Sequence, residues 1–185
     1  MPVIERKGAA SSQGFGEFAK LSGGSTANYI EDVFSTYLYT GTGASKTITN
    51  NIDLSTKGGL VWIKDRTNAY NNNLFDTVQG ATKLLHSNTG NQVNTSGDNF
   101  VSWTFRKQTK FFDVVSYTGN GIAGTSIGHN LGSTPGCVIV KRTSGAVGPS
   151  YIVYHSGLNG GTNPAQYCLI LNDTTGQIQL TNMWN

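Results

Sequence analysis

The sequence predicts an all-β protein built from antiparallel sheets, and three observations support this fold class. The 185-residue chain contains 24 Gly, and only 12% of its residues are charged. That composition suits strands and tight turns better than helices. Runs of β-branched and aromatic residues alternate with turns rich in Gly, Asn and Ser. Two runs, at 58–66 and 135–142, carry nearly the same signal: a buried strand that ends in charge.

The expected strands follow one another from residue 33 onward. The strand-like runs are 33–39, 59–66, 74–77, 100–105, 111–117, 137–142, 151–154, 167–171 and 177–181, with a short element at 81–85. The clearest is 100–105, where Val101, Trp103 and Phe105 alternate with Ser102 and Thr104. This period-two pattern predicts a sheet with one dry face, the face of Val101, Trp103 and Phe105.

An internal repeat divides the chain. Tyr39 and its neighbours match Tyr117 at an offset of 78, and Lys64 matches Lys141 at an offset of 77. We therefore expect an extended N-terminal arm at 1–30 and two tandem β units, at 31–110 and 111–185. The second unit has no counterpart of the Trp103 strand, which predicts an open sheet edge. Because proteins normally pair or cover such edges, this points to an assembly or to a longer chain.

The first 30 residues show no sustained hydrophobic period. Phe15, Phe18 and Leu21 are isolated apolar residues within a Gly- and Ser-rich segment. One interpretation is a disordered leader. The alternative, which these apolar residues favour, is a docking arm that becomes ordered on a neighbouring subunit.

The motifs that carry enzyme chemistry are weak. The G-x-G-x-x-G pattern at 119–124 is not followed by a helical period, so a hairpin turn is the better interpretation. The three histidines have no metal-ligand spacing, and no two carboxylates are marked as a catalytic pair. Asp76 and Asp98 are the best pair for a Ca²⁺ site, without further support. We expect no enzyme activity, no cofactor and no metal.

Charge and hydropathy also exclude some partners. The net charge of +3 is small and its carriers are scattered, which argues against a nucleic-acid surface. No stretch of about 18 apolar residues is present, so no membrane span is predicted.

The positions of the aromatic residues and cysteines indicate which of them we expect to be buried and which could form a surface contact. Trp62 and Trp103 lie in apolar strands and are expected in the core. A better surface contact is formed by three neighbouring residues, Tyr70, Asn71 and Asn72. Cys137 takes the place of Leu60 in the repeat, which favours a small buried residue. Whether Cys137 pairs with Cys168 is left open.

Four segments resemble a family of tandem-repeat structural proteins of tailed bacteriophages, chiefly of marine and cyanobacterial hosts. They are residues 32–41, 58–64, 96–107 and 129–136. The resemblance implies concanavalin-type (LamG-like) β-sandwich modules with a jelly-roll topology, strung along virion fibres or decorating a particle. Members of that family usually carry more repeat length than this chain.

The resemblance implies a non-enzymatic virion structural protein, assembled in the host cytoplasm. The expected form is a fibre or appendage subunit, a homotrimer that contacts other virion proteins through its N-terminal arm and a host surface glycan further out. The alternatives are a capsid decoration (cement) protein that stabilises the shell, and a carbohydrate-active enzyme on a concanavalin-like sandwich.

Overall fold

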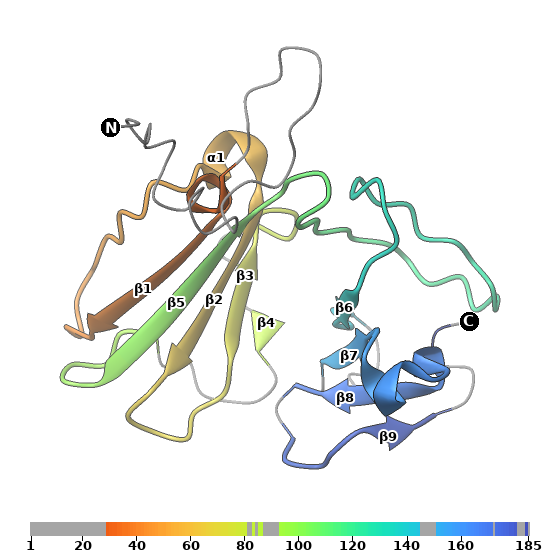
Figure 1. The fold of residues 1–185 in the computed structure, drawn as a ribbon. Coiled ribbons are helices and arrows are strands. Elements are labelled where there is room, and N and C mark those ends of the chain that lie inside the picture. Colours follow the sequence, from red (N-terminus) through yellow and green to blue (C-terminus); the bar gives the residue numbers. More distant parts are fainter. Residues whose placement is uncertain are drawn as a thin grey trace, which may run out of the picture.

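The protein folds into two antiparallel sheets with almost no helix, which confirms the predicted all-β class (Figure 1). The structure is a computed structural model that describes residues 29–80, 83, 85–86, 93–144, 151–171, 173–180 and 184. The elements, with η for 3₁₀ turns, are η2 (Ile30–Asp32), β1 (Phe34–Thr40), α1 (Leu54–Lys57), β2 (Gly59–Asp65), β3 (Asn73–Asp76), β4 (Leu85–His86), β5 (Asn99–Arg106), β6 (Cys137–Val140), β7 (Ile152–His155), η3 (Leu158–Gly161), η4 (Pro164–Gln166), β8 (Tyr167–Ile170) and β9 (Ile178–Gln179). None of the helices in the described ranges is long and apolar enough to cross a membrane.

The first sheet contains five strands in the order β1-β5-β2-β3-β4. β5 lies between β1 and β2 and pairs with both along its whole length. Trp62 of β2 lies directly opposite Trp103 of β5, and the two rings meet edge to face with centroids 5.5 Å apart. The strand around Trp103 therefore joins β1 to the rest of the sheet.

Two glycines allow β2 to begin beside β5. Gly58 ends α1 with a φ of 72°, in the left-handed region that glycine tolerates best. A Cβ atom on Gly59 would lie 2.0 Å from the carbonyl oxygen of Phe105 and 2.7 Å from the Leu54 side chain. A larger residue at position 59 is therefore incompatible with this approach of the two strands.

The faces of the first sheet are covered differently from the prediction. Ser102 and Thr104 are 1% and 3% exposed, whereas Trp103 and Phe105 on the opposite face are only half-buried. The expectation that the Trp103 face is the dry one is therefore wrong, although Val101 on that face is buried. The reason is the segment at 48–53, which lies over the face of Ser102 and Thr104 and shields it.

The second sheet contains four strands in the order β6-β7-β8-β9. Its buried residues include Val153 and Cys168, and Leu158 of η3 is buried too. Tyr151, just before β7, is 2% exposed and donates its hydroxyl hydrogen to the Leu85 carbonyl of β4. Figure 1 shows the second sheet beside the β4 side of the first. Tyr151 thus ties the two sheets together.

The strand predicted at 111–117 does not form. A single bridge between Gln108 and Phe112 follows β5, and the chain then runs without a strand to residue 136. Lys107 forms an ion pair of 2.8 Å with Asp113, and residues 115–130 are exposed. The repeat explains this outcome. The counterpart of 112–118 is β1, which is held in the first sheet by β5 alone, and no described strand takes the place of β5 beside β6.

The two cysteines are free and differ in exposure. Cys168 is fully buried, but Cys137 is exposed. The expectation that Cys137 is a buried apolar residue is wrong, because β6 is an edge strand that pairs with β7 only.

Candidate functional site

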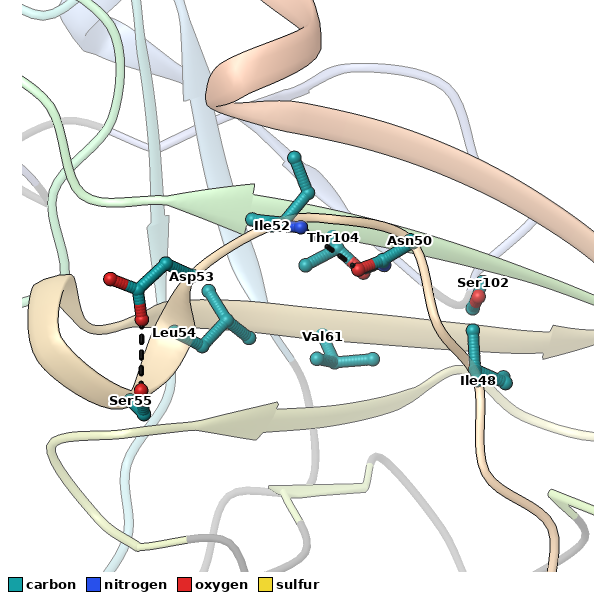
Figure 2. A pocket seen from close by; sticks show the side chains of 9 residues that line it. All are labelled: Ile48, Asn50, Ile52, Asp53, Leu54, Ser55, Val61, Ser102 and Thr104. Carbon is teal, nitrogen blue, oxygen red and sulfur yellow. Dashed lines mark hydrogen bonds between the residues drawn. The ribbon is translucent and has the colours of Figure 1, made fainter.

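A cleft of about 340 Å³ lies on the hydroxyl-bearing face of the first sheet. Figure 2 shows the side chains around it. Its floor comes from β2 and β5, one wall from the segment 48–52 that crosses the sheet, and one end from the start of α1. The lining residues are Ile48, Asn50, Ile52, Asp53, Leu54, Ser55, Val61, Ser102 and Thr104.

Asn50 attaches this crossing segment to the sheet. Its Nδ2 donates to Thr104 Oγ1 at 2.7 Å, and its Oδ1 accepts from the backbone N–H of Ile52 at 3.2 Å. Nearby, the buried Ser102 Oγ has no hydrogen-bond partner among the described residues. The cleft floor therefore carries one unsatisfied polar group, and a buried hydroxyl without a partner reduces stability by about 1–3 kcal/mol.

Asp53 is the carboxylate at the end of the cleft, and its oxygens are already engaged. It caps α1: Oδ1 accepts from the Thr56 N–H at 3.0 Å and from Ser55 Oγ at 2.9 Å, and Oδ2 accepts from Thr56 Oγ1. These hydrogen bonds, first those from Thr56, lower the pKa of Asp53 to about 2. The group is therefore ionised at neutral pH and has no proton to give as a general acid.

The lining of the cleft mixes polar and apolar groups. Hydroxyl and amide groups stand beside isoleucine, leucine and valine side chains, and among the lining residues no histidine, cysteine or second carboxylate is present. A small neutral group with polar and apolar sides would match the lining.

The predicted surface contact lies on the opposite face and is partly occupied. Tyr70 is 39% exposed, while Asn71 and Asn72 are half-buried. Asn72 Oδ1 accepts a hydrogen bond of 2.9 Å from Trp62 Nε1, and Lys64 Nζ donates to the Tyr70 carbonyl. Asn72 thus contacts the half-buried Trp62, which is not the fully enclosed core residue that the sequence predicts.

The remaining residues considered from the sequence are dispersed or not described. Phe15, Phe18 and Leu21 of the predicted arm lie outside the described residues. Asp98 lies just before the start of β5. Asp76 pairs with Leu60 of β2, and Leu60 pairs with Phe105 near the other end of β5. At about 3.3 Å per residue these carboxylates are roughly 20 Å apart, too far to share a cation. No group of three potential metal ligands occurs within the described ranges.

The other acidic groups of the first sheet are also bound locally. Asp65 Oδ1 accepts from the N–H groups of Thr67 and Asn68, and Asp76 Oδ1 accepts from those of Val78 and Gln79. Each carboxylate therefore closes the turn that follows its strand. The exposed His129 and His155 likewise accept at Nδ1 from backbone N–H groups two residues ahead.

Sequence reasoning missed the cleft for an identifiable reason. Ser102 and Thr104 have the small polar side chains of a solvent-facing strand side, so the pattern placed them in water. The signal available was the pair Ile48 and Ile52, two apolar residues in an otherwise polar loop. A loop with spaced apolar side chains is able to cover a sheet face.

The comparisons with known proteins identify a family. The family described as Domain of unknown function (DUF7483) matches the chain over two ranges, residues 30–98 and 89–185. No curated protein and no solved structure matches the chain. The two ranges together span most of the sequence, so the chain belongs to the DUF7483 domain family.

Proposed function

We propose that this chain is a structural protein of a bacteriophage virion, most simply a fibre or appendage subunit that acts through its interfaces. The observation that carries the proposal is the pair of matches to one domain family within a single chain. Successive copies of one β module are an economical way to build an extended or particle-coating assembly. The resemblance of residues 32–41, 58–64, 96–107 and 129–136 to phage tandem-repeat proteins supplies the setting.

In this proposal each unit is a concanavalin-like sandwich module with jelly-roll topology, and the units follow one another in tandem. The family matches support the tandem order, and the two antiparallel sheets are compatible with a sandwich. The predicted arm, with Phe15, Phe18 and Leu21, attaches the subunit to other virion proteins. Host glycan contact falls at Tyr70 and its neighbours, because Tyr70 is exposed and Asn72 is hydrogen-bonded to the half-buried Trp62.

The local chemistry supports a role without catalysis. Asp53, Asp65 and Asp76 each accept backbone hydrogen bonds that close turns or cap a helix. A glycosidase on this fold would need one carboxyl group held protonated near neutral pH, and the low pKa of Asp53 is the opposite condition. Within the chain, Arg106 donates to Gln108 and Lys107 forms an ion pair with Asp113.

The test is the state of assembly of the full chain. We expect an elongated trimer that resists detergent, measured by sedimentation velocity and by gel electrophoresis of unheated samples. A triple variant, Phe15→Ser with Phe18→Ser and Leu21→Ser, should keep the trimer but lose attachment to virion proteins. A compact monomer that attaches to no virion protein would contradict the proposal.

Copy number separates the fibre from its alternative. A fibre or appendage subunit is present in few copies per particle, whereas a cement protein is present in numbers comparable to the shell protein. Quantitative staining of purified particles decides between them. Release of reducing sugar from host polysaccharide by the purified chain would instead favour the alternative of a carbohydrate-active enzyme.

A further inference from the structure

We propose that the open edge of β6 is a docking site for a β-strand of the β5 type, supplied by a further domain of this family. The first sheet of this same chain shows how such a strand is held. The inference rests on the repeat, the sheet order and the exposure of β6, and does not depend on the virion setting.

The family boundaries and the sheet boundaries do not coincide. The first matched range ends at residue 98, and β5 (Asn99–Arg106) falls only within the second range, 89–185. In the structure, however, β5 lies in the first sheet, between β1 and β2. A strand that belongs in sequence to one match therefore completes the sheet of the match before it.

Among the described residues, the corresponding place in the second sheet, beside β6, holds no strand. The repeat aligns β6 with β2, since Leu60 corresponds to Cys137 and Lys64 to Lys141. β2 pairs with β5 on one side and β3 on the other, whereas β6 pairs with β7 alone. Its other edge faces no strand of the described residues. The unpaired N–H and C=O groups of an edge strand accept an extended peptide by adding it to the sheet.

Side-chain exposure along β6 indicates what that peptide must provide. Cys137 is exposed and Ile139 is 39% exposed. Their counterparts in β2 lie directly opposite two aromatic residues of β5, Phe105 and Trp103. The uncovered positions of β6 are therefore the positions that β5 covers with large rings in the first sheet.

The alternate residues of β6, Val138 and Val140, are less exposed, and their counterparts in β2 lie opposite small residues of β5. Val138 and Val140 are half-buried. They correspond to Val61 and Ile63, which lie opposite Thr104 and Ser102 of β5. The occupant that fits β6 thus alternates large aromatic with small hydroxyl side chains, which is the β5 pattern.

The segment after β5 shows a second consequence of the open place. Residues 112–118 correspond to β1, which pairs with β5 only. Here they form no strand, and Val115 and Tyr117 are 42% and 53% exposed. A docked β5-type strand would give this segment the pairing partner that it lacks.

Two other occupants fit less well. The β5 strand of a second copy of this chain is already paired on both edges, so it is not free to leave its sheet. Edge-to-edge pairing of two β6 strands offers no aromatic ring to cover Ile139. A β5-type strand of a further family domain that is not paired within its own sheet would supply the aromatic rings that β6 lacks.

The experiment uses the full chain and a dye-labelled synthetic peptide with the sequence of residues 96–107. Fluorescence anisotropy measures binding, and hydrogen–deuterium exchange locates it. We expect saturable binding, slower exchange at residues 137–140, and about tenfold or more weaker binding by the variant Ile139→Lys. The matched control is Leu38→Lys, which places the same charge at a 60% exposed position on the outer strand β1 and should leave binding unchanged. A peptide carrying Trp103→Ser should bind more weakly, and a scrambled peptide should not bind.

Each alternative result overturns the proposal. Absence of peptide binding, with exchange at 137–140 unaltered in the wild-type chain, removes the docking site. Binding that Ile139→Lys does not weaken assigns the peptide to exchange with β5 in the first sheet. A dimer that Ile139→Lys dissociates, without peptide binding, assigns the edge to a second copy.

Discussion

Removal of one hydroxyl group, in the variant Tyr151→Phe, tests how the two sheets are joined. The Tyr151 ring is buried, and its O–H donates to the carbonyl of Leu85 in β4. The phenylalanine ring keeps the packing but leaves that carbonyl without its donor. Loss of a buried hydrogen bond of this kind costs about 1–2 kcal/mol, so the free energy of unfolding should fall by that amount in urea titrations.

The same variant has a second signature, at alkaline pH. Burial, and then the charge of Asp76, raise the pKa of Tyr151 well above its usual value of 10. The unfolded chain therefore loses this proton above pH 10 while the folded chain keeps it. The stability is present below pH 10 and declines above it, by about 1.4 kcal/mol per pH unit for this group. Tyr151→Phe should remove that part of the slope.

The control for the stability measurement is Tyr117→Phe, in the segment that forms no strand. Its ring is 53% exposed, so removal of its hydroxyl should leave the free energy of unfolding unchanged. Tyr39, whose pKa burial and Asp65 raise to about 12, contributes equally in all three proteins and cancels in the comparison. Equal stability and equal slopes for wild type and Tyr151→Phe would refute the role assigned to this hydrogen bond.

Three further predictions concern single groups. Ser102→Ala should be neutral or stabilising by up to about 1 kcal/mol in urea titrations, because it removes a buried hydroxyl without a partner; marked destabilisation would show that the hydroxyl is bonded. Burial opposes ionisation of Asp113, but hydrogen bonds from Lys107 and a backbone N–H dominate and lower its pKa, so its contribution is present above about pH 4 and is lost as pH falls through the folded-state value. Asp113→Asn should reduce stability at pH 7 and flatten the acid limb of the stability curve, and an unchanged limb would argue against the pair. A thiol reagent should modify Cys137 rapidly in the folded protein and Cys168 only after unfolding, so equal rates would contradict the exposure difference.

Much of the fold follows from local pattern alone. Alternating apolar residues and turn glycines located β1, β2, β5 and β6 to within a few residues, because the period-two pattern of a strand is a local property of neighbouring residues. The turn glycines before β2 likewise answer to a local requirement, the left-handed φ of Gly58. The internal repeat, visible as matched residues 77 or 78 positions apart, predicts an open sheet edge, and no described strand pairs with the outer edge of β6.

Tertiary structure decided the features that depend on which segments meet. Ser102 and Thr104 look solvent-facing in sequence, and only the loop carrying Ile48 and Ile52 turns their face into the lined cleft. The run at 111–117 has the composition of a strand, but strand formation also needs a paired neighbour, and its counterpart β1 has that neighbour in β5. Composition determines which stretches are able to be strands; hydrogen-bonding partners, brought together from distant parts of the chain, determine which of them become strands.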